Sequence, residues 1–422
     1  MVYKSYKMGS YNLHTIKTNR FKTIRMEIMF RNNINPENIV KRTMLFELLL
    51  ESSKKYKSKR DLILKCEELY NANIYAETMK VGNEVVSAIN YEILDPKYTD
   101  DLDLEEALKL PFDIIFNPDV IDTEFNEEKL ETIKIRSLAE LDALKENSKR
   151  YAISEALKAM DSKSVSSINI LGDRESINRV NKSNIFQEYM YILEHDYIDI
   201  YVIGDINEDK IIDIVNKHQH FNTIKHHEVS LYVDNKVRTR INKVDAKEKL
   251  NQSQLIYIMN LNNLSKFETS YVSHIFNHIL GGGSLDSRLY KNLRIDNSLC
   301  YSVSSNYSKY DRLMIISTSI DKDNIKLAKK LIEDAIKSMG ANVSDEEVDI
   351  ARQAIVNAMK VSLDSEHQII SNYFFNEIAD LDLIDKRIEE YAKVTKEDVV
   401  NMYKKIKINT IYVLEGDQNG EN

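Results

Sequence analysis

The residues with the clearest chemical potential lie in the stretch 279-ILGGGSLDSRLYKNLRIDNSLCYSVSS-305. Three consecutive glycines, Gly281, Gly282 and Gly283, separate two helical patterns, and Arg294 and Tyr301 follow at a spacing of seven residues. A guanidinium and a phenol that are fixed near one point can donate hydrogen bonds to negative charge on a carbonyl oxygen. The alternative is structural, because a strand tyrosine commonly packs and a cation at a helix end complements the helix dipole.

The glycine run has two compatible interpretations. Glycine adopts backbone conformations that other residues resist, so residues 281–283 could form a flexible loop that touches a substrate or a partner. They could also end one helix before Ser284 caps the next, which is expected over Leu285–Arg294. The apolar stripe of that helix would be Leu285, Leu289 and Leu293. A phosphate-binding loop is excluded, because neither G-K-[ST] nor G-x-G-x-x-G occurs here.

Other residues that could carry chemistry give weaker patterns. His274 and His278 are four residues apart on a predicted helix, a spacing compatible with metal binding, but no third ligand is near them in sequence. Cys66 is expected in the core, and Cys300 is expected on the strand face opposite Tyr301. The sequence contains no G-x-S-x-G, H-x-x-E-H or H-E-x-x-H motif.

Composition narrows the class of protein. The 422 residues carry a net charge of -9, which disfavours nucleic-acid binding because phosphates require a concentrated basic surface. The basic cluster 54-KKYKSKR-60 is expected to be a solvated turn, with a partner-binding patch as the alternative. Two distant cysteines, no apolar signal peptide and no apolar stretch of membrane-spanning length predict a soluble, cytoplasmic protein that does not bind membranes.

An internal repeat organises the elements that would position these residues. Residues 24–50 align without gaps with residues 254–280, an offset of 230, and both are typical of a strand, an Asn-Asn turn and a helix. The other corresponding pairs are the strand–turn segments 198–218 and 408–422, the helices 126–145 and 344–365, and the strand pairs 74–93 and 301–320. The second of these helices begins with a capping box, Ser344 and Glu347.

The repeat predicts an α+β fold with two homologous halves, each a mainly antiparallel sheet with helices on one face. The expected boundaries are 1–220 for the N-terminal half, 221–240 for a linker and 241–422 for the C-terminal half. Two halves joined in this way suggest a clamshell with a cavity between them or against a partner.

The segment Gly281–Val303 is where the chain resembles a known family. Its order of apolar helix, LGGG, second helix, LR and L-x-Y-S-V is similar to the C-terminal half of the pitrilysin/insulinase clan of zinc metallopeptidases, which includes mitochondrial processing peptidase. The resemblance implies that Arg294 and Tyr301 point toward a peptide bound at zinc and donate hydrogen bonds to its backbone and oxyanion.

The zinc-binding part of that family's site is missing from this sequence. The family carries H-x-x-E-H on a first-half helix, and a glutamate roughly 75–80 residues further on completes the zinc site. Alignment of the helix ends places Thr43, Phe46 and Glu47 at the positions of His, Glu and His. The residues in the zone of the third ligand are Glu124, Glu127, Glu128 and Glu131. Without the histidines they are the acidic first turn of a helix, so we expect no metal or other cofactor in this chain.

The resemblance therefore implies a zinc-free, non-catalytic subunit that contributes Arg294 and Tyr301 to the zinc site of a partner. The partner would be a zinc-bearing homologous subunit of similar length, and the substrate would be a peptide or small unfolded protein, bound by strand addition. Among such chains the sequence is similar to the YfmF type, which is associated with elongation factor P modification. A homodimer of the isolated chain, an inactive scaffold or binding protein without a role in proteolysis, and an enzyme of unrelated chemistry remain as alternatives.

Overall fold

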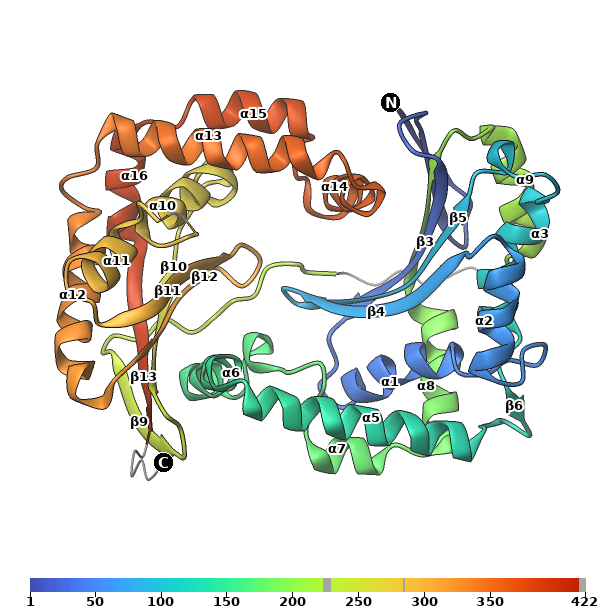
Figure 1. Cartoon of the computed structure of the whole chain (residues 1–422), viewed down its shortest axis with the longest axis horizontal. Helices are drawn as coiled ribbons and strands as arrows, with labels where there is room; N and C mark the ends of the chain where they lie inside the picture. The colour runs from blue at the N-terminus through green and yellow to red at the C-terminus, as the bar shows by residue number, and fades with distance from the viewer. Residues whose placement is uncertain (223–228, 284, 417–422) are drawn as a thin grey trace. The chain divides into compact units, whose positions relative to one another are not determined.

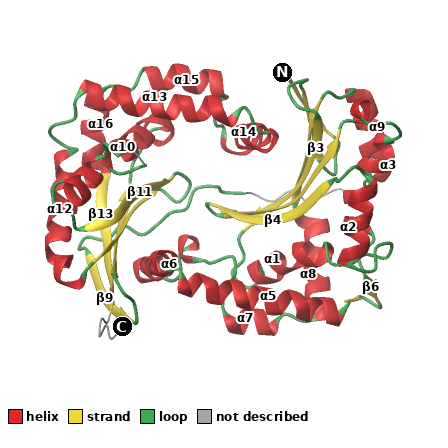
Figure 2. Ribbon diagram, in the orientation of Figure 1, coloured by secondary structure: helices red, strands yellow, loops and turns green. Residues whose placement is uncertain are grey.

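The computed structural model describes residues 1–222, 229–283 and 285–416, which form two compact units (Figures 1 and 2). Unit 1 comprises Met1–Asp142, Asn169–Ser230 and Ser365–Ile370. Unit 2 comprises Ala143–Ile168, Leu231–Asp364 and Ser371–Asn422. The chain passes from unit 1 to unit 2 at Ser230 and Leu231, inside the linker predicted over 221–240.

Unit 1 is built on a mixed sheet of six strands. The strands are β1 (Val2–Lys7), β2 (Asn12–Lys17), β3 (Thr23–Asn33), β4 (Asn73–Val81), β5 (Glu84–Leu94) and β8 (Tyr197–Gly204). Their order is β1-β2-β8-β3-β5-β4, and every pair is antiparallel except β2 and β8. The short strands β6 (Val120–Ile121) and β7 (Glu124–Phe125) form a separate hairpin.

Helices of unit 1 cover one face of this sheet. They are α1 (Ile39–Leu49), α2 (Lys59–Glu68), α3 (Leu104–Leu108), α4 (Leu110–Phe116), α5 (Glu127–Glu146), α7 (Arg174–Arg179), α8 (Lys182–His195) and α9 (Glu208–His218). Helix α1 packs on β4, β5 and α8, as Figure 1 shows. The predicted turn with the basic cluster lies between α1 and α2, where Lys55 and Lys57 pair with Asp113 and Asp119.

Unit 2 repeats the topology of unit 1. Its strands are β9 (Asn242–Glu248), β10 (Ser253–Leu261), β11 (Cys300–Ser308), β12 (Leu313–Ile320) and β13 (Ile406–Gly416). The order β11-β12-β10-β13-β9 matches β4-β5-β3-β8-β2 of unit 1, and the parallel pair β13 and β9 matches β8 and β2. The predicted strand pairs 74–93 and 301–320 are β4 with β5 and β11 with β12. The repeat inferred from the sequence is therefore confirmed.

The main core of unit 2 lies between one face of this sheet and most of the unit's helices. These helices are α10 (Ser273–Leu280), α11 (Arg288–Tyr290), α12 (Ile325–Ser338), α13 (Asp345–Ser362), α15 (Ile384–Ala392) and α16 (Lys396–Met402). Helix α14 (Glu366–Ala379) connects α13 to α15. Tyr257 and Met259 of β10 and Phe276 of α10 are fully buried in this core. The predicted capping box at the start of α13 is present, because the side chains and amides of Ser344 and Glu347 bond reciprocally.

The other face of the unit 2 sheet is covered by α6 (Ser148–Asp161). Ala152, Ala156 and Met160 of this helix pack on Ile256 and Ile258 of β10. Successive residues of a strand point to opposite faces, so β10 is apolar on both sides and its sequence is a nearly continuous apolar run. This second helical layer adds to the layer that the sequence predicted. No helix in the described ranges is long and apolar enough to cross a membrane.

Candidate functional site

Arg294 belongs to a short helical segment that is anchored in the unit 2 core. Helix α11 continues into a π-helical turn over Lys291–Ile295, and Leu289 and Leu293 of this segment are completely buried. The two leucines fix the segment so that Arg294 is half-buried and Ile295 is exposed. The chain then turns at Ser298, where the amide bonds back to the Arg294 carbonyl at 3.2 Å, and enters β11.

The structure brings Arg294 and Tyr301 together. The guanidinium carbon of Arg294 lies 5.2 Å from the centroid of the Tyr301 ring, which is cation–π distance. Arg294 Nη1 donates a hydrogen bond to the Cys300 carbonyl at 3.1 Å. In the part of the chain that the structure describes, no carboxylate pairs with this guanidinium. Its remaining N–H groups can therefore donate to an external ligand.

Tyr301 faces outward because of a local irregularity in β11. The register between β11 and β12 shifts between Cys300 and Val303, which indicates a β-bulge that re-aims side chains. Tyr301 is 80% exposed, whereas Cys300 is buried in the core, so the predicted opposition of these two residues is confirmed. Burial raises the pKa of the Cys300 thiol, which suits a packing residue and not a nucleophile.

Two large exposed residues adjoin Arg294. Ile295 follows Arg294 in sequence and the Tyr301 ring lies under its guanidinium, and the two residues are 61% and 80% exposed.

The glycine run ends α10 and lies close to β11. The Gly281 carbonyl accepts a hydrogen bond from the Ser305 amide at 2.8 Å, and a Cβ at Gly281 would lie 2.7 Å from the Leu289 side chain. Close packing therefore disfavours a side chain at Gly281. Gly283 has φ +115°, a conformation that side-chain-bearing residues rarely adopt. Ser284, the predicted N-cap, lies outside the described residues.

The predicted start of the helix over 285–294 was wrong. Ser287 is extended and serves as the N-cap position, so the helix begins at Arg288. Leu285 therefore precedes the helix and is 71% exposed, whereas Leu289 and Leu293 are buried as predicted. The physical reason is that a stripe at helical spacing says nothing about where the helix begins.

The zinc-motif positions on α1 do not form a metal site. The Thr43 hydroxyl donates to the carbonyls of Ile39 and Ile170 at 3.0 and 3.1 Å, and Phe46 is buried with its ring edge-to-face against Phe30. Of the three aligned residues, Glu47 alone offers a free ligand atom. A structural zinc site needs four ligands and a catalytic site three, so these residues do not fit the metal. The described residues contain no group of three or more His, Cys, Asp or Glu placed to hold an ion.

Of the four acidic residues in the predicted zone of the third ligand, only two lie in the first turn of a helix. Glu127 and Glu128 form the acidic first turn of α5, as expected, and the remaining pair of acids bind neighbouring lysines. Lys182 pairs with Glu124 at 3.0 Å, and Lys134 pairs with Glu131 at 2.7 Å.

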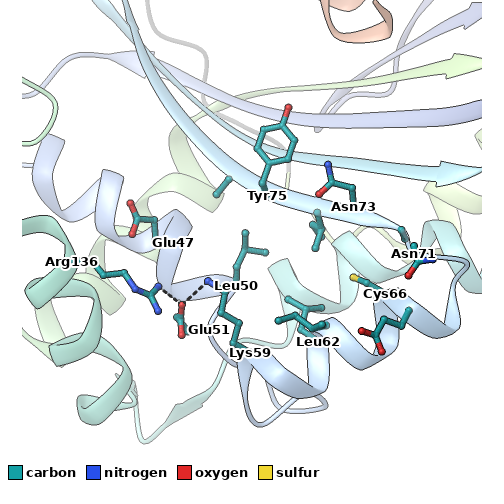
Figure 3. A pocket seen from close by; sticks show the side chains of 15 residues that line it. Glu47, Leu50, Glu51, Lys59, Leu62, Cys66, Asn71, Asn73, Tyr75 and Arg136 are labelled. Carbon is teal, nitrogen blue, oxygen red and sulfur yellow. Dashed lines mark hydrogen bonds and ion pairs between the residues drawn. The ribbon is translucent and has the colours of Figure 1, made fainter. Parts of the chain in front are cut away.

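The residue of α5 that reaches the end of α1 is Arg136, which the sequence analysis missed. Its guanidinium pairs with Glu51, and Lys59 Nζ lies 3.1 Å from the same carboxylate. Figure 3 shows Glu51 between these two cations, with Glu47 to one side. The contact depends on how α5 is placed against α1. The sequence offered one sign of this residue: Arg136 lies two to three turns into the predicted helix 126–145, which begins with the acidic residues discussed above.

The two histidines of α10 have structural surroundings. Burial lowers the pKa of His274 to about 4, and its ring packs edge-on against Tyr307 at 5.1 Å. His274 is therefore neutral at physiological pH. Burial also lowers the pKa of His278. This agrees with the core-facing helix that the sequence predicted.

Comparisons with known proteins agree with this picture. Residues 180–355 match the family model described as peptidase M16 inactive domain. The chain is also similar to a Bacillus subtilis protein described as "Probable inactive metalloprotease YmfF". The two are 23% identical over 430 residues, which cover 98% of this chain and 97% of the relative.

Solved structures with the same fold include proteins from three other bacteria. A conserved protein from Enterococcus faecalis has a TM-score of 0.93 at 24% identity, and covers 99% of this chain and 100% of its own. A peptidase M16 inactive domain from Pseudomonas fluorescens has a TM-score of 0.80 at 16% identity over 100% of both chains. A protease from Helicobacter pylori has a TM-score of 0.77 at 11% identity, over 98% and 99% of the two chains.

The predicted fold class and family resemblance are thus confirmed, while the YfmF-type grouping and its association with elongation factor P remain predictions. The matched family model and the Bacillus subtilis relative are both described as inactive. In this chain Thr43, Phe46 and Glu47 stand at the aligned positions of the zinc motif. The chain thus resembles the inactive members of the M16 peptidases.

Proposed function

We propose that this chain is the zinc-free subunit of a two-component metallopeptidase of the cytoplasm. It would contribute Arg294 and Tyr301 to substrate and transition-state binding at the zinc site of a homologous partner of similar length. The proposal is carried by two observations: Arg294 lies over the exposed Tyr301 ring in unit 2, and the α1 positions of the zinc motif in unit 1 cannot hold zinc. Two buried cysteines that remain free thiols support a reducing compartment.

The pair supplies fixed hydrogen-bond donors. Zinc in the partner would activate the water that attacks the peptide carbonyl. The Arg294 guanidinium is held by the Cys300 carbonyl and the Tyr301 ring, so it needs little reorganisation as negative charge develops on the carbonyl oxygen. The exposed Tyr301 hydroxyl offers a second donor from the neighbouring strand. Each donor of this kind is worth about 3–4 kcal/mol in the transition state.

The sheet of unit 2 also favours an extended substrate. Strand β11 carries Tyr301 and is an edge strand, so its outer backbone groups can pair with another chain. A peptide that adds to this edge would run past Tyr301 and Arg294. In strand addition the affinity comes mainly from hydrogen bonds to the peptide backbone, which suits unfolded peptides or small unfolded proteins.

The test combines the chain with a zinc-bearing homologous subunit and measures hydrolysis of a quenched fluorescent peptide. Arg294→Ala and Tyr301→Phe are each expected to lower kcat/KM by about 10²–10³-fold, because each removes a transition-state donor. Association of the two subunits, measured by analytical ultracentrifugation, should not change. Tyr232→Phe is the matched control, because Tyr232 also carries an arginine over its ring, Arg312 at 4.8 Å, but lies outside the proposed site.

The alternative function is an inactive scaffold or binding protein with no role in proteolysis. It predicts that the chain binds its partner while both variants leave peptide turnover at the wild-type level. That result would refute a site-lending role for Arg294 and Tyr301.

A further inference from the structure

A pocket of about 540 Å³ lies in unit 1, next to the replaced zinc motif (Figure 3). Its walls are the end of α1, one face of α2, the start of β4 and Arg136 of α5. Residues 59, 62, 63, 66 and 67 of α2 line it, which is the spacing of a single helix face. Its volume is in the range of pockets that bind small ligands or peptide side chains.

The pocket has apolar walls that remain open to solvent. Leu50, Leu62 and Ile74 contribute aliphatic surface, and Ile63 at the rim is 50% exposed. Such walls suit the methylene stem of a long side chain, since lysine and arginine bury their stems against apolar surface while the charged head stays polar.

The charged residues that line the pocket include more acids than bases. Lys59 and Arg136 both pair with Glu51. Within the described ranges, the Glu47 carboxylate has no hydrogen bond or ion pair, although it is half-buried. Burial and the neighbouring Glu140 raise the pKa of Glu47, against the opposing effect of the more distant Arg136 and Lys59, which are paired with Glu51. Glu67 adds a third acid to the lining, so the pocket has surplus negative charge.

An edge strand runs along the pocket. β4 is the last strand of the unit 1 sheet and, among the strands of the described residues, pairs with β5 alone, so its outer backbone groups are available to an extended chain. Ile74 and Ala76 of β4 line the pocket. An extended peptide on this edge would direct every second side chain toward the same face, and one of them could enter the pocket.

We propose that this pocket binds a lysine or arginine side chain of an extended peptide, with its stem on Leu50, Leu62 and Ile74 and its charge on Glu47. Replacement of the zinc motif would thus have left a side-chain recognition site in unit 1, separate from the Arg294 and Tyr301 pair of unit 2. The inference rests on the proposed function only for the peptide nature of the ligand.

The test uses dye-labelled, acetylated and amidated heptapeptides of alternating Val and Thr with one central residue, either Lys, Arg, Gln or Glu. Fluorescence anisotropy with the full chain should show that the Lys and Arg peptides bind about tenfold more tightly than the Gln peptide, as expected for one charge-assisted contact. Glu47→Gln should remove this preference. Glu68→Gln is the matched control, because Glu68 is an acid on α2, the other helix that lines the pocket, but it pairs with Lys65 outside the pocket lining.

Charge reversal provides a second, gain-of-function arm. Glu47→Lys should make the Glu peptide the tightest ligand, a result that a merely destabilised protein would not give. Arg294→Ala should leave the Lys preference intact, which separates this site from the proposed function. Equal binding of the Lys and Gln peptides by the wild type would overturn the proposal. Displacement of the Lys peptide by micromolar Zn²⁺ would also overturn it, because the acids would then form a cation site.

Discussion

At the scale of single residues, the charged group next to the replaced zinc motif is a structural anchor. Arg42 precedes Thr43 on α1, is buried and pairs with the fully buried Asp196. Its guanidinium also donates to the Ser87 hydroxyl at 3.0 Å and the Phe30 carbonyl at 2.8 Å. These bonds tie α1 to β3 and β5, which explains why the helix keeps its place although its metal ligands are gone.

Asp196→Asn should therefore lower the free energy of unfolding by about 3–5 kcal/mol, because it leaves a buried guanidinium without its counter-charge. Urea unfolding followed by circular dichroism measures this loss. Glu175→Gln serves as the control, since Glu175 forms an exposed pair with Arg179 and its loss should cost about 0.5 kcal/mol or less. Equal effects of the two substitutions would contradict the anchoring role of Arg42.

A buried acid on α8 should make stability depend on pH. Burial raises the pKa of Glu188 to about 7, against the opposing effect of Arg42 and Lys41. The folded state thus favours the protonated acid, so this stabilisation is complete below a pH of about 4.5 and disappears as the pH rises through about 7. Glu188→Gln should be about 2 kcal/mol more stable than the wild type near pH 8 and similar to it near pH 4.5. Denaturant titrations of the wild type and Glu188→Gln at the two pH values measure their free energies of unfolding. The same difference between the two proteins at both pH values would contradict the raised pKa of Glu188.

At the scale of elements, the segment that carries Arg294 is held to α13 by a clamp. Arg288 donates to both oxygens of Glu347, at 2.9 and 2.8 Å, and also to the Ser338 hydroxyl and the Asn342 carbonyl. Glu347 is at the same time part of the capping box of α13. The position of Arg294 therefore depends on a neighbouring helix through one bidentate contact.

Arg288→Ala should lower kcat with little change in KM in the two-component peptidase, because Arg294 stays present but less precisely placed. Arg288→Lys should restore only part of the rate, since lysine cannot form the bidentate contact. Steady-state kinetics with the quenched peptide separate the two parameters. A wild-type kcat in Arg288→Ala would show that the clamp does not position the site.

The sequence predicted most elements but not their placement. Alternating strands, the Ser344 capping box and the offset of 230 follow from local patterns, and the structure contains all of them. The contact of Arg136 with Glu51 could not be predicted, because nothing local fixes the register of α5 against α1. The same holds for the stacking of Arg294 on Tyr301, which depends on a π-helical turn and a bulge.

At the scale of the whole molecule, each half of the repeat contributes one segment to the compact unit of the other half. Helix α6 follows α5 in the first copy and belongs to unit 2, while the first turn of α14 follows α13 in the second copy and belongs to unit 1. A domain limit drawn at one linker therefore separates α6 from the sheet that it covers. The sequence could not reveal this, because α6 has the ordinary pattern of an amphipathic helix.

This interlacing predicts that residues 231–422 will not fold by themselves. Without α6, a buried apolar face of the unit 2 sheet, formed by Ile256, Ile258, Leu313, Tyr412 and Leu414, would be open to water, and exposed apolar surface of this kind promotes aggregation. The fragment should bind the dye ANS and unfold without cooperativity.

Residues 143–168 joined to Leu231 by a flexible linker should restore a sharp unfolding transition, because Ala152, Ala156 and Met160 then cover the face. The same fusion with Ala156→Asp should fail, since it places an unpaired charge at a fully buried position. Cooperative unfolding of residues 231–422 alone would show that α6 is dispensable and that the single-linker division is the correct one.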